Sequence, residues 1–132
     1  MLSGGNSNVD QEDEIKFTEA DRLRNESKFV EALSVLEQLL PRYPKKVSLL
    51  FTLAHVNWEL QNFERAADLF RTVTHINPKS EMASLGLFHC LWGIGKQEEA
   101  LDEVKRFMAV SYSKDYVRII REINEENKTE AS

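Results

Sequence analysis

The chain has 132 residues, and its 22 acidic side chains outnumber its 17 Lys and Arg, which gives a formal net charge of −5. This length predicts one domain with a modest hydrophobic core, and no apolar run approaches the roughly 20 residues that span a membrane. The acidic balance offers no cluster of Lys and Arg of the kind that binds nucleic acid. A lone cysteine excludes an internal disulfide framework. We therefore expect no nucleic-acid or membrane partner, while composition leaves enzyme, chaperone and adaptor open.

Residues 1–9 are rich in Gly, Ser and Asn and predict a disordered polar tail. Residues 10–14 are mostly acidic, which suits the first turn of a helix because the helix dipole favours negative charge there. No basic segment followed by an apolar one is visible at this end, so the default location is the cytoplasm. We expect a single domain over 10–128 and a short tail over 129–132.

From residue 13 the chain repeats its pattern of residue types every 34 residues, and the predicted repeats are 13–46, 47–80 and 81–114. Within each repeat, apolar residues recur at i, i+3, i+4 and i+7 in two stretches, which is the spacing of two amphipathic helices. Polar or glycine-containing dipeptides at 61–62 and 95–96 separate the two stretches. Pro44 and Pro78 end the first two repeats because proline blocks a helix, and Ser80 is placed to cap the next helix. Each repeat therefore predicts a helical hairpin.

The second repeat is the clearest, and it carries the signature residues Leu50, Leu53, Ala54, Phe63, Ala66, Phe70 and Pro78. This pattern resembles the tetratricopeptide repeat. The first repeat matches through Ala20, Phe29, Ala32, Leu36 and Pro44. The third is weaker, with Phe88 where a small residue is usual and Tyr112 where proline is usual; a register through Leu85-Gly86 would break the 34-residue spacing, which we keep. The resemblance implies an all-α, right-handed superhelical solenoid of three helix-turn-helix hairpins.

Residues 115–127 form an amphipathic segment that predicts a C-terminal capping helix. Its apolar side consists of Tyr116, Val117, Ile119, Ile120 and Ile123, and its expected outer side carries Arg118, Arg121, Glu122 and Glu125. A terminal repeat needs such a cover because its core face is otherwise exposed.

In the family that the chain resembles, the first helices of the hairpins line a concave side that usually holds a peptide or a helix of a partner. The period places ten residues there: Phe17, Asp21 and Arg24 in the first repeat, Phe51, His55 and Trp58 in the second, and Met82, Leu85, His89 and Trp92 in the third. A mainly aromatic groove would suit an amphipathic segment whose anchors insert between the rows. In the alternative interpretation, these side chains pack against neighbouring repeats or the terminal helix, or they mediate self-association, and no groove remains.

Two finer hypotheses concern this surface. Co-chaperones of the family that bind the C-terminal carboxylate of heat-shock proteins use Lys, Asn and Arg on these rows, where this chain has Phe17, Asp21, His55 and Met82, so membership of that group is not expected. If His55 lies beside Asp21, protonation of the imidazole would make ligand affinity vary between roughly pH 5 and pH 7.

Metal binding and catalysis are not expected. Histidines in neighbouring repeats would lie roughly 10 Å apart, whereas zinc needs ligands at about 2 Å, and Cys90 is interpreted as a small buried hydrophobe. No Ser or Cys stands at useful helical spacing from a His and an acid. We therefore predict a protein-interaction module, an adaptor without cofactor or enzymatic activity, that binds a protein or peptide partner. The alternatives are a small chaperone for a secreted or aggregation-prone client and a self-associating scaffold, which would form a homodimer.

Overall fold

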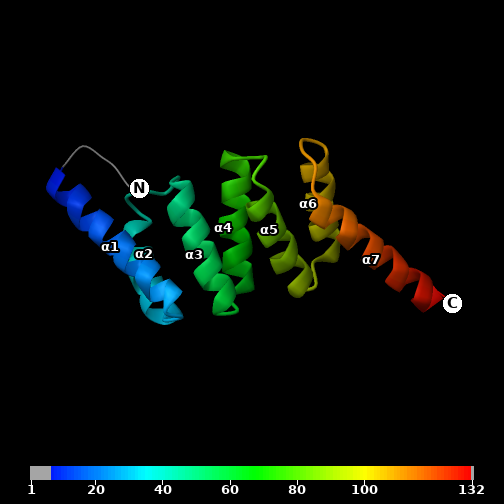
Figure 1. Cartoon of the computed structure of the whole chain (residues 1–132), viewed down its shortest axis with the longest axis horizontal. Helices are drawn as coiled ribbons and strands as arrows, with labels where there is room; N and C mark the ends of the chain where they lie inside the picture. The colour runs from blue at the N-terminus through cyan, green and yellow to red at the C-terminus, as the bar shows by residue number, and fades with distance from the viewer. Residues whose placement is uncertain (1–6, 132) are drawn as a thin grey trace.

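The computed structural model describes residues 7–131, with side chains from 11 to 129. This part of the chain forms seven helices and no strand: α1 (Ser7–Asn25), α2 (Phe29–Leu39), α3 (Val47–Glu59), α4 (Phe63–Ile76), α5 (Glu81–Gly93), α6 (Gln97–Met108) and α7 (Lys114–Ala131). Successive helices are arranged along the long axis of the molecule, from α1 at one end to α7 at the other (Figure 1). The predicted all-α helical repeat is confirmed. None of the described helices is long and apolar enough to cross a membrane.

The helix boundaries follow the predicted 34-residue period. Helices α2, α4 and α6 begin at residues 29, 63 and 97, and α3 and α5 begin at residues 47 and 81. Alanines at the predicted contact points of the hairpins are fully buried: Ala20 and Ala32, Ala54 and Ala66, and Ala100. A methyl group at these points lets two helix axes approach closely, which a larger side chain would prevent.

Both ends of the helical region differ from the sequence-based expectation. Helix α1 begins at Ser7, so residues 7–9 of the expected tail are helical, while residues 1–6 of that tail lie outside the described part of the chain. The acidic residues that follow favour a helix N-terminus and support this early start. Helix α7 runs to Ala131, past the expected end at 127, because no Gly or Pro interrupts it.

Helix α7 also begins one residue earlier than the period requires. The Ser113 hydroxyl accepts a hydrogen bond from the backbone N–H of Tyr116 at 3.1 Å, as the Ser80 hydroxyl accepts one from Ala83 at 3.3 Å. The predicted cap at Ser80 is therefore confirmed. Ser113 follows Ser80 by 33 residues rather than 34, and one residue corresponds to about 100° of rotation on a helix. Each residue of α7 therefore lies about 100° further around its helix than it would if the 34-residue period continued exactly.

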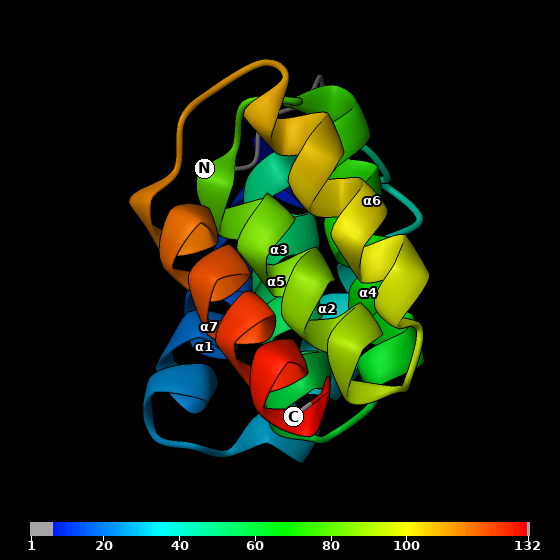
Figure 2. The same ribbon diagram turned by 90° about the vertical axis from the view of Figure 1, so that its right-hand side faces the viewer.

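Two buried polar clusters connect elements that are distant in sequence. At the α1 end, the Asp13 carboxylate is 1% exposed and accepts hydrogen bonds from the Arg42 guanidinium, at 2.9 Å to each oxygen, and from the Tyr43 hydroxyl at 2.7 Å. At the α7 end, the Tyr116 and Ser84 hydroxyls are 2.7 Å apart, and Ser84 donates to the Glu103 carboxylate at 2.5 Å. The second cluster joins α5, α6 and α7, which meet at the end of the molecule (Figure 2).

The turn inside each hairpin uses one residue with left-handed backbone. Ser27, Gln61 and Gly95 have φ angles of 60°, 64° and 84°, and they are spaced by 34 residues. The backbone N–H of the following residue bonds back across the turn in each case, as from Asn62 to the Asn57 carbonyl at 2.8 Å. This is the helix C-terminal motif that glycine adopts most easily, because other residues meet their own Cβ in this conformation.

This geometry predicts opposite effects at two equivalent positions. We expect Gln61→Gly to raise the free energy of unfolding by about 1 kcal/mol, since it relieves left-handed backbone strain, and Gly95→Ala to lower it by about 1 kcal/mol. Urea denaturation followed by circular dichroism measures both. Equal effects of the two substitutions would contradict the assignment of strain to Gln61.

Candidate functional site

The described surface has two adjoining hollows over α1, α3 and α5. The first, which we call the apolar hollow, has a volume of about 210 Å³ and is lined by Phe51, His55, Trp58, Phe70, Met82, Gly86 and His89. The second, the polar hollow, has a volume of about 560 Å³ and is lined by Phe17, Asp21, Arg24, Val47, Ser48, Phe51, Thr52, Ser80, Glu81 and Met82. Phe51 and Met82 line both hollows, which therefore adjoin, and we call the two together the groove.

The floor of the apolar hollow is made by a close approach of α4 and α5. A Cβ atom at Gly86 would lie 2.7 Å from the ring of Phe70, so only glycine allows this approach. The Phe70 ring in turn packs edge-on against Phe51, with centroids 5.6 Å apart. The Phe70 ring therefore packs directly against the backbone of Gly86, and both residues line the hollow.

The walls of the apolar hollow include unusually exposed apolar side chains. Met82 is 69% exposed and Trp58 is 39% exposed, and the indole of Trp58 stacks with His55 at a centroid distance of 6.4 Å. Burying such a side chain against a partner would remove apolar surface from water, which is the main source of binding free energy. This arrangement can bind an apolar side chain.

The carboxylate beside His55 is Glu59, not Asp21 as the pH hypothesis required. The distance from His55 Nε2 to Glu59 Oε1 is 3.5 Å, whereas Asp21 pairs with Arg24 of the same helix at 3.1 Å. Three residues separate Asp21 from Arg24, which places the two side chains on one helix face. The proposed pH switch between these two repeats thus has no support from the geometry.

His89 lies where the groove meets α7. Burial lowers the pKa of His89, the nearby guanidinium of Arg118 lowers it further, and the carboxylate of Asp115 opposes this shift. The imidazole is therefore neutral at physiological pH. Both charged neighbours, Arg118 and Asp115, come from the first turns of α7.

Eight of the ten predicted residues line the groove, and two do not. The ring of Trp92 stacks on that of Phe88 with centroids 5.6 Å apart, and Leu85 packs against the core. For these two, the alternative interpretation of packing within the protein describes the structure. Sequence reasoning missed Phe70 and Gly86; the Leu85-Gly86 pair was noticed only as a competing register, and glycine in a helix is itself a signal of close approach.

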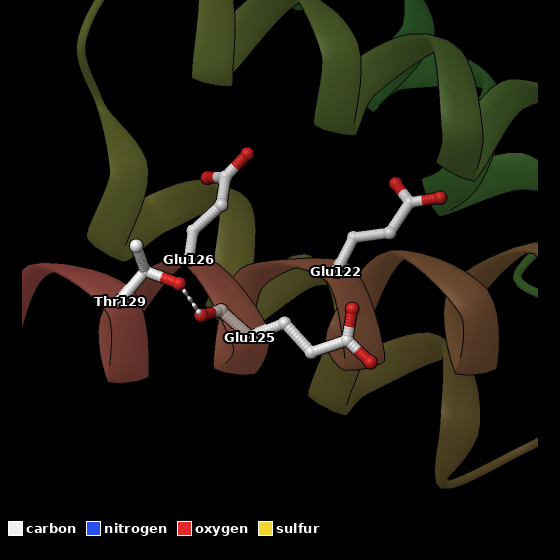
Figure 3. A pocket seen from close by; sticks show the side chains of 4 residues that line it. All are labelled: Glu122, Glu125, Glu126 and Thr129. Carbon is white, nitrogen blue, oxygen red and sulfur yellow. Dashed lines mark hydrogen bonds between the residues drawn. The ribbon is translucent and has the colours of Figure 1, made fainter.

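A further hollow lies on α7 and is wholly different in character. It is lined by Glu122, Glu125, Glu126 and Thr129, and the Thr129 hydroxyl donates to the Glu125 carbonyl at 3.1 Å (Figure 3). Glu122 and Glu126 point to the same side of the helix (Figure 3). Among the described side chains, no group of three or more His, Cys, Asp or Glu could hold a metal ion.

Comparison with known proteins identifies the repeat. A family model described as tetratricopeptide repeat matches residues 23–86. A solved structure of the first tetratricopeptide domain of Spaghetti (RPAP3), bound to the HSP90 peptide SRMEEVD, is similar with a TM-score of 0.74 and 16% identity over 89% of this chain and 94% of that one. The tetratricopeptide domain of Sgt2 from Aspergillus fumigatus gives 0.70 and 18% over 89% and 82%.

A chain of the CopN–Scc3 complex is similar as well, with a TM-score of 0.71 and 14% identity over 87% of this chain and 68% of that one. No curated protein matches the sequence. At these identities the similarity shows the fold alone, so the ligands of the three structures are properties of those proteins.

Proposed function

We propose that this chain, whose residues 23–86 match the tetratricopeptide repeat family, is an adaptor whose groove binds a peptide or an amphipathic helix of a protein partner. The observation that carries the proposal is the apolar hollow, with its exposed Met82 and Trp58 beside buried Phe70. The structure of the Spaghetti domain holds a peptide, which supports a similar use of this fold here. We assign no catalytic activity, because the groove contains no nucleophile paired with a base.

Binding is expected to depend on a few anchor contacts. In most interfaces a small number of large side chains, often Trp, carry most of the binding free energy. Trp58 occupies such a position, since one face of its ring stacks on His55 and the rest borders the apolar hollow. An apolar side chain of the partner would enter the hollow over Phe70 and contact Trp58 and Met82.

Trp58→Ala should therefore weaken peptide binding by about 2 kcal/mol, or about thirtyfold. Peptides would first be selected from a random display library on the wild-type protein, and their affinities would then be measured by calorimetry. Val30→Ala is the matched control, because Val30 is 65% exposed on α2 and lies outside the groove. Selected peptides that bind a folded Met82→Glu variant as tightly as the wild type would refute the proposal.

A chaperone for an aggregation-prone client and a self-associating scaffold would use the same groove. Light scattering across a concentration series separates the second from the adaptor. A mass that doubles with concentration in the wild type, but not in Met82→Glu, would show that a second copy occupies the groove.

A further inference from the structure

Charged side chains of α7 lie near the apolar hollow. Asp115, Arg118 and Glu122 are spaced i, i+3 and i+7, which places them on one face of that helix. Asp115 and Arg118 act electrostatically on His89, which lines the apolar hollow. This face of α7 therefore lies next to the groove instead of on the outer side that the sequence predicts.

Arg118 on this face is already engaged in ion pairs. The Arg118 guanidinium lies 3.3 Å from Asp115 and 3.9 Å from Glu122. Glu125 and Glu126, which line the same hollow as Glu122 (Figure 3), take part in none of the ion pairs found among residues 11–129. Glu126 follows Glu122 by four residues and so continues this face of α7. Together the three glutamates form an acidic surface on α7, which we call the acidic flank: Glu122, Glu125 and Glu126.

Carboxylates also border the groove elsewhere. Glu59 lies beside His55, and Glu81 lines the polar hollow, in which the Arg24 charge is offset by Asp21. His89 is neutral for the reasons given above. Carboxylates are thus found near the apolar hollow on α3, α5 and α7, and the charges of a partner must complement them for it to bind well.

We propose that the partner of this groove is a basic amphipathic segment. An apolar side chain of the segment enters the apolar hollow, and Lys or Arg side chains next along the segment contact the acidic flank. The inference rests on the proposed function, since it specifies the chemistry of the ligand of the same groove. A segment with acidic residues at those positions would meet like charges and bind poorly.

The test uses two synthetic peptides that have Leu at the same positions and contain no Trp. One peptide has Lys at all the remaining positions, and the other has Glu at those positions. Calorimetry, with emission of Trp58 and Trp92 as a second readout, measures their affinities for the full chain. We expect binding of the Lys peptide only. Raising the salt concentration from about 0.05 M to about 0.5 M should weaken this binding, since exposed charges are screened.

Variants locate the interaction. Glu122→Gln/Glu125→Gln/Glu126→Gln should weaken the Lys peptide about tenfold, as expected for several exposed charge pairs. The matched control, Glu31→Gln/Glu64→Gln/Glu98→Gln, changes the net charge equally at exposed sites on α2, α4 and α6 and should have no effect. Equal losses in both variants would overturn the inference, because they would reflect net charge alone.

Two further outcomes distinguish a failure of the proposed basic partner from a failure of the proposed peptide-binding function. If the Glu peptide binds as well as or better than the Lys peptide, and Met82→Glu abolishes that binding, the groove binds peptides but the proposed basic partner is wrong. If neither these two peptides nor peptides selected by display bind in a way that depends on Met82, both the function and the inference fail.

Discussion

Tyr116→Ala is expected to lower the free energy of unfolding by about 4 kcal/mol, the typical cost of deleting a large aromatic ring from a packed core. Tyr116 is fully buried, and its ring packs edge-on against Phe88 at 5.8 Å and Phe107 at 5.7 Å. Its hydroxyl bonds to Ser84, which donates to the buried Glu103. The substitution therefore removes both the apolar contact and the polar link that hold α7 on α5 and α6.

In Tyr116→Ala, we expect local unfolding to begin at α7. Hydrogen exchange measured by mass spectrometry is expected to show faster exchange of α7 amides in Tyr116→Ala, with α3 amides less affected, because α7 is the terminal element. Tyr116→Phe keeps the ring and removes one hydrogen bond, so it should cost only about 1 kcal/mol. Equal destabilisation by the two variants would show that the hydroxyl, and not the ring, holds the helix.

Asp13→Ala is expected to lower the free energy of unfolding by about 3 kcal/mol. The carboxylate accepts hydrogen bonds from Arg42 and Tyr43, and bonds to a charged group are worth about 2 kcal/mol each before the loss of solvation is subtracted. Breaking a buried charged contact from one side is costly because the other groups lose their partner. Chemical denaturation at neutral pH measures the effect, and a change below 1 kcal/mol would show that the cluster is not stabilising.

The same residue predicts how stability depends on pH. Burial raises the pKa of Asp13, but the hydrogen bonds from Tyr43 and Arg42 outweigh it and hold the pKa below its ordinary value of 3.8. The folded state thus favours the carboxylate. Its stabilisation is fully present above the ordinary pKa and is lost as the pH falls through the lowered one. Below about pH 4, the free energy of unfolding of the wild type should therefore fall more steeply with decreasing pH than that of Asp13→Asn.

The helical hairpins, their period and the turns between them follow from the sequence. Apolar spacing of 3 and 4 residues determines which side of each helix is buried, and this property is local to the helix. Positions such as Phe51, His55 and Trp58 are therefore on the predicted face, and the structure brings them together with Met82 from the next hairpin. Repetition at 34 residues was enough to align these helices in space.

Features that depend on contacts between hairpins could not be predicted from the sequence and are visible only in the tertiary structure. Gly86 and Phe70 come from different helices, and their close contact forms part of the lining of the hollow. Trp92 does not line the groove, because it stacks on Phe88. The connection before α7 is shorter than the period by one residue, which turns that helix by about 100°. In the folded chain Arg118 lies near enough to His89 to lower the pKa of that imidazole, and Glu122 lies 3.9 Å from Arg118. The sequence by itself determined the faces of each helix, and the tertiary packing decided what each face meets, because loop length and side-chain fit set the rotation of one helix against the next.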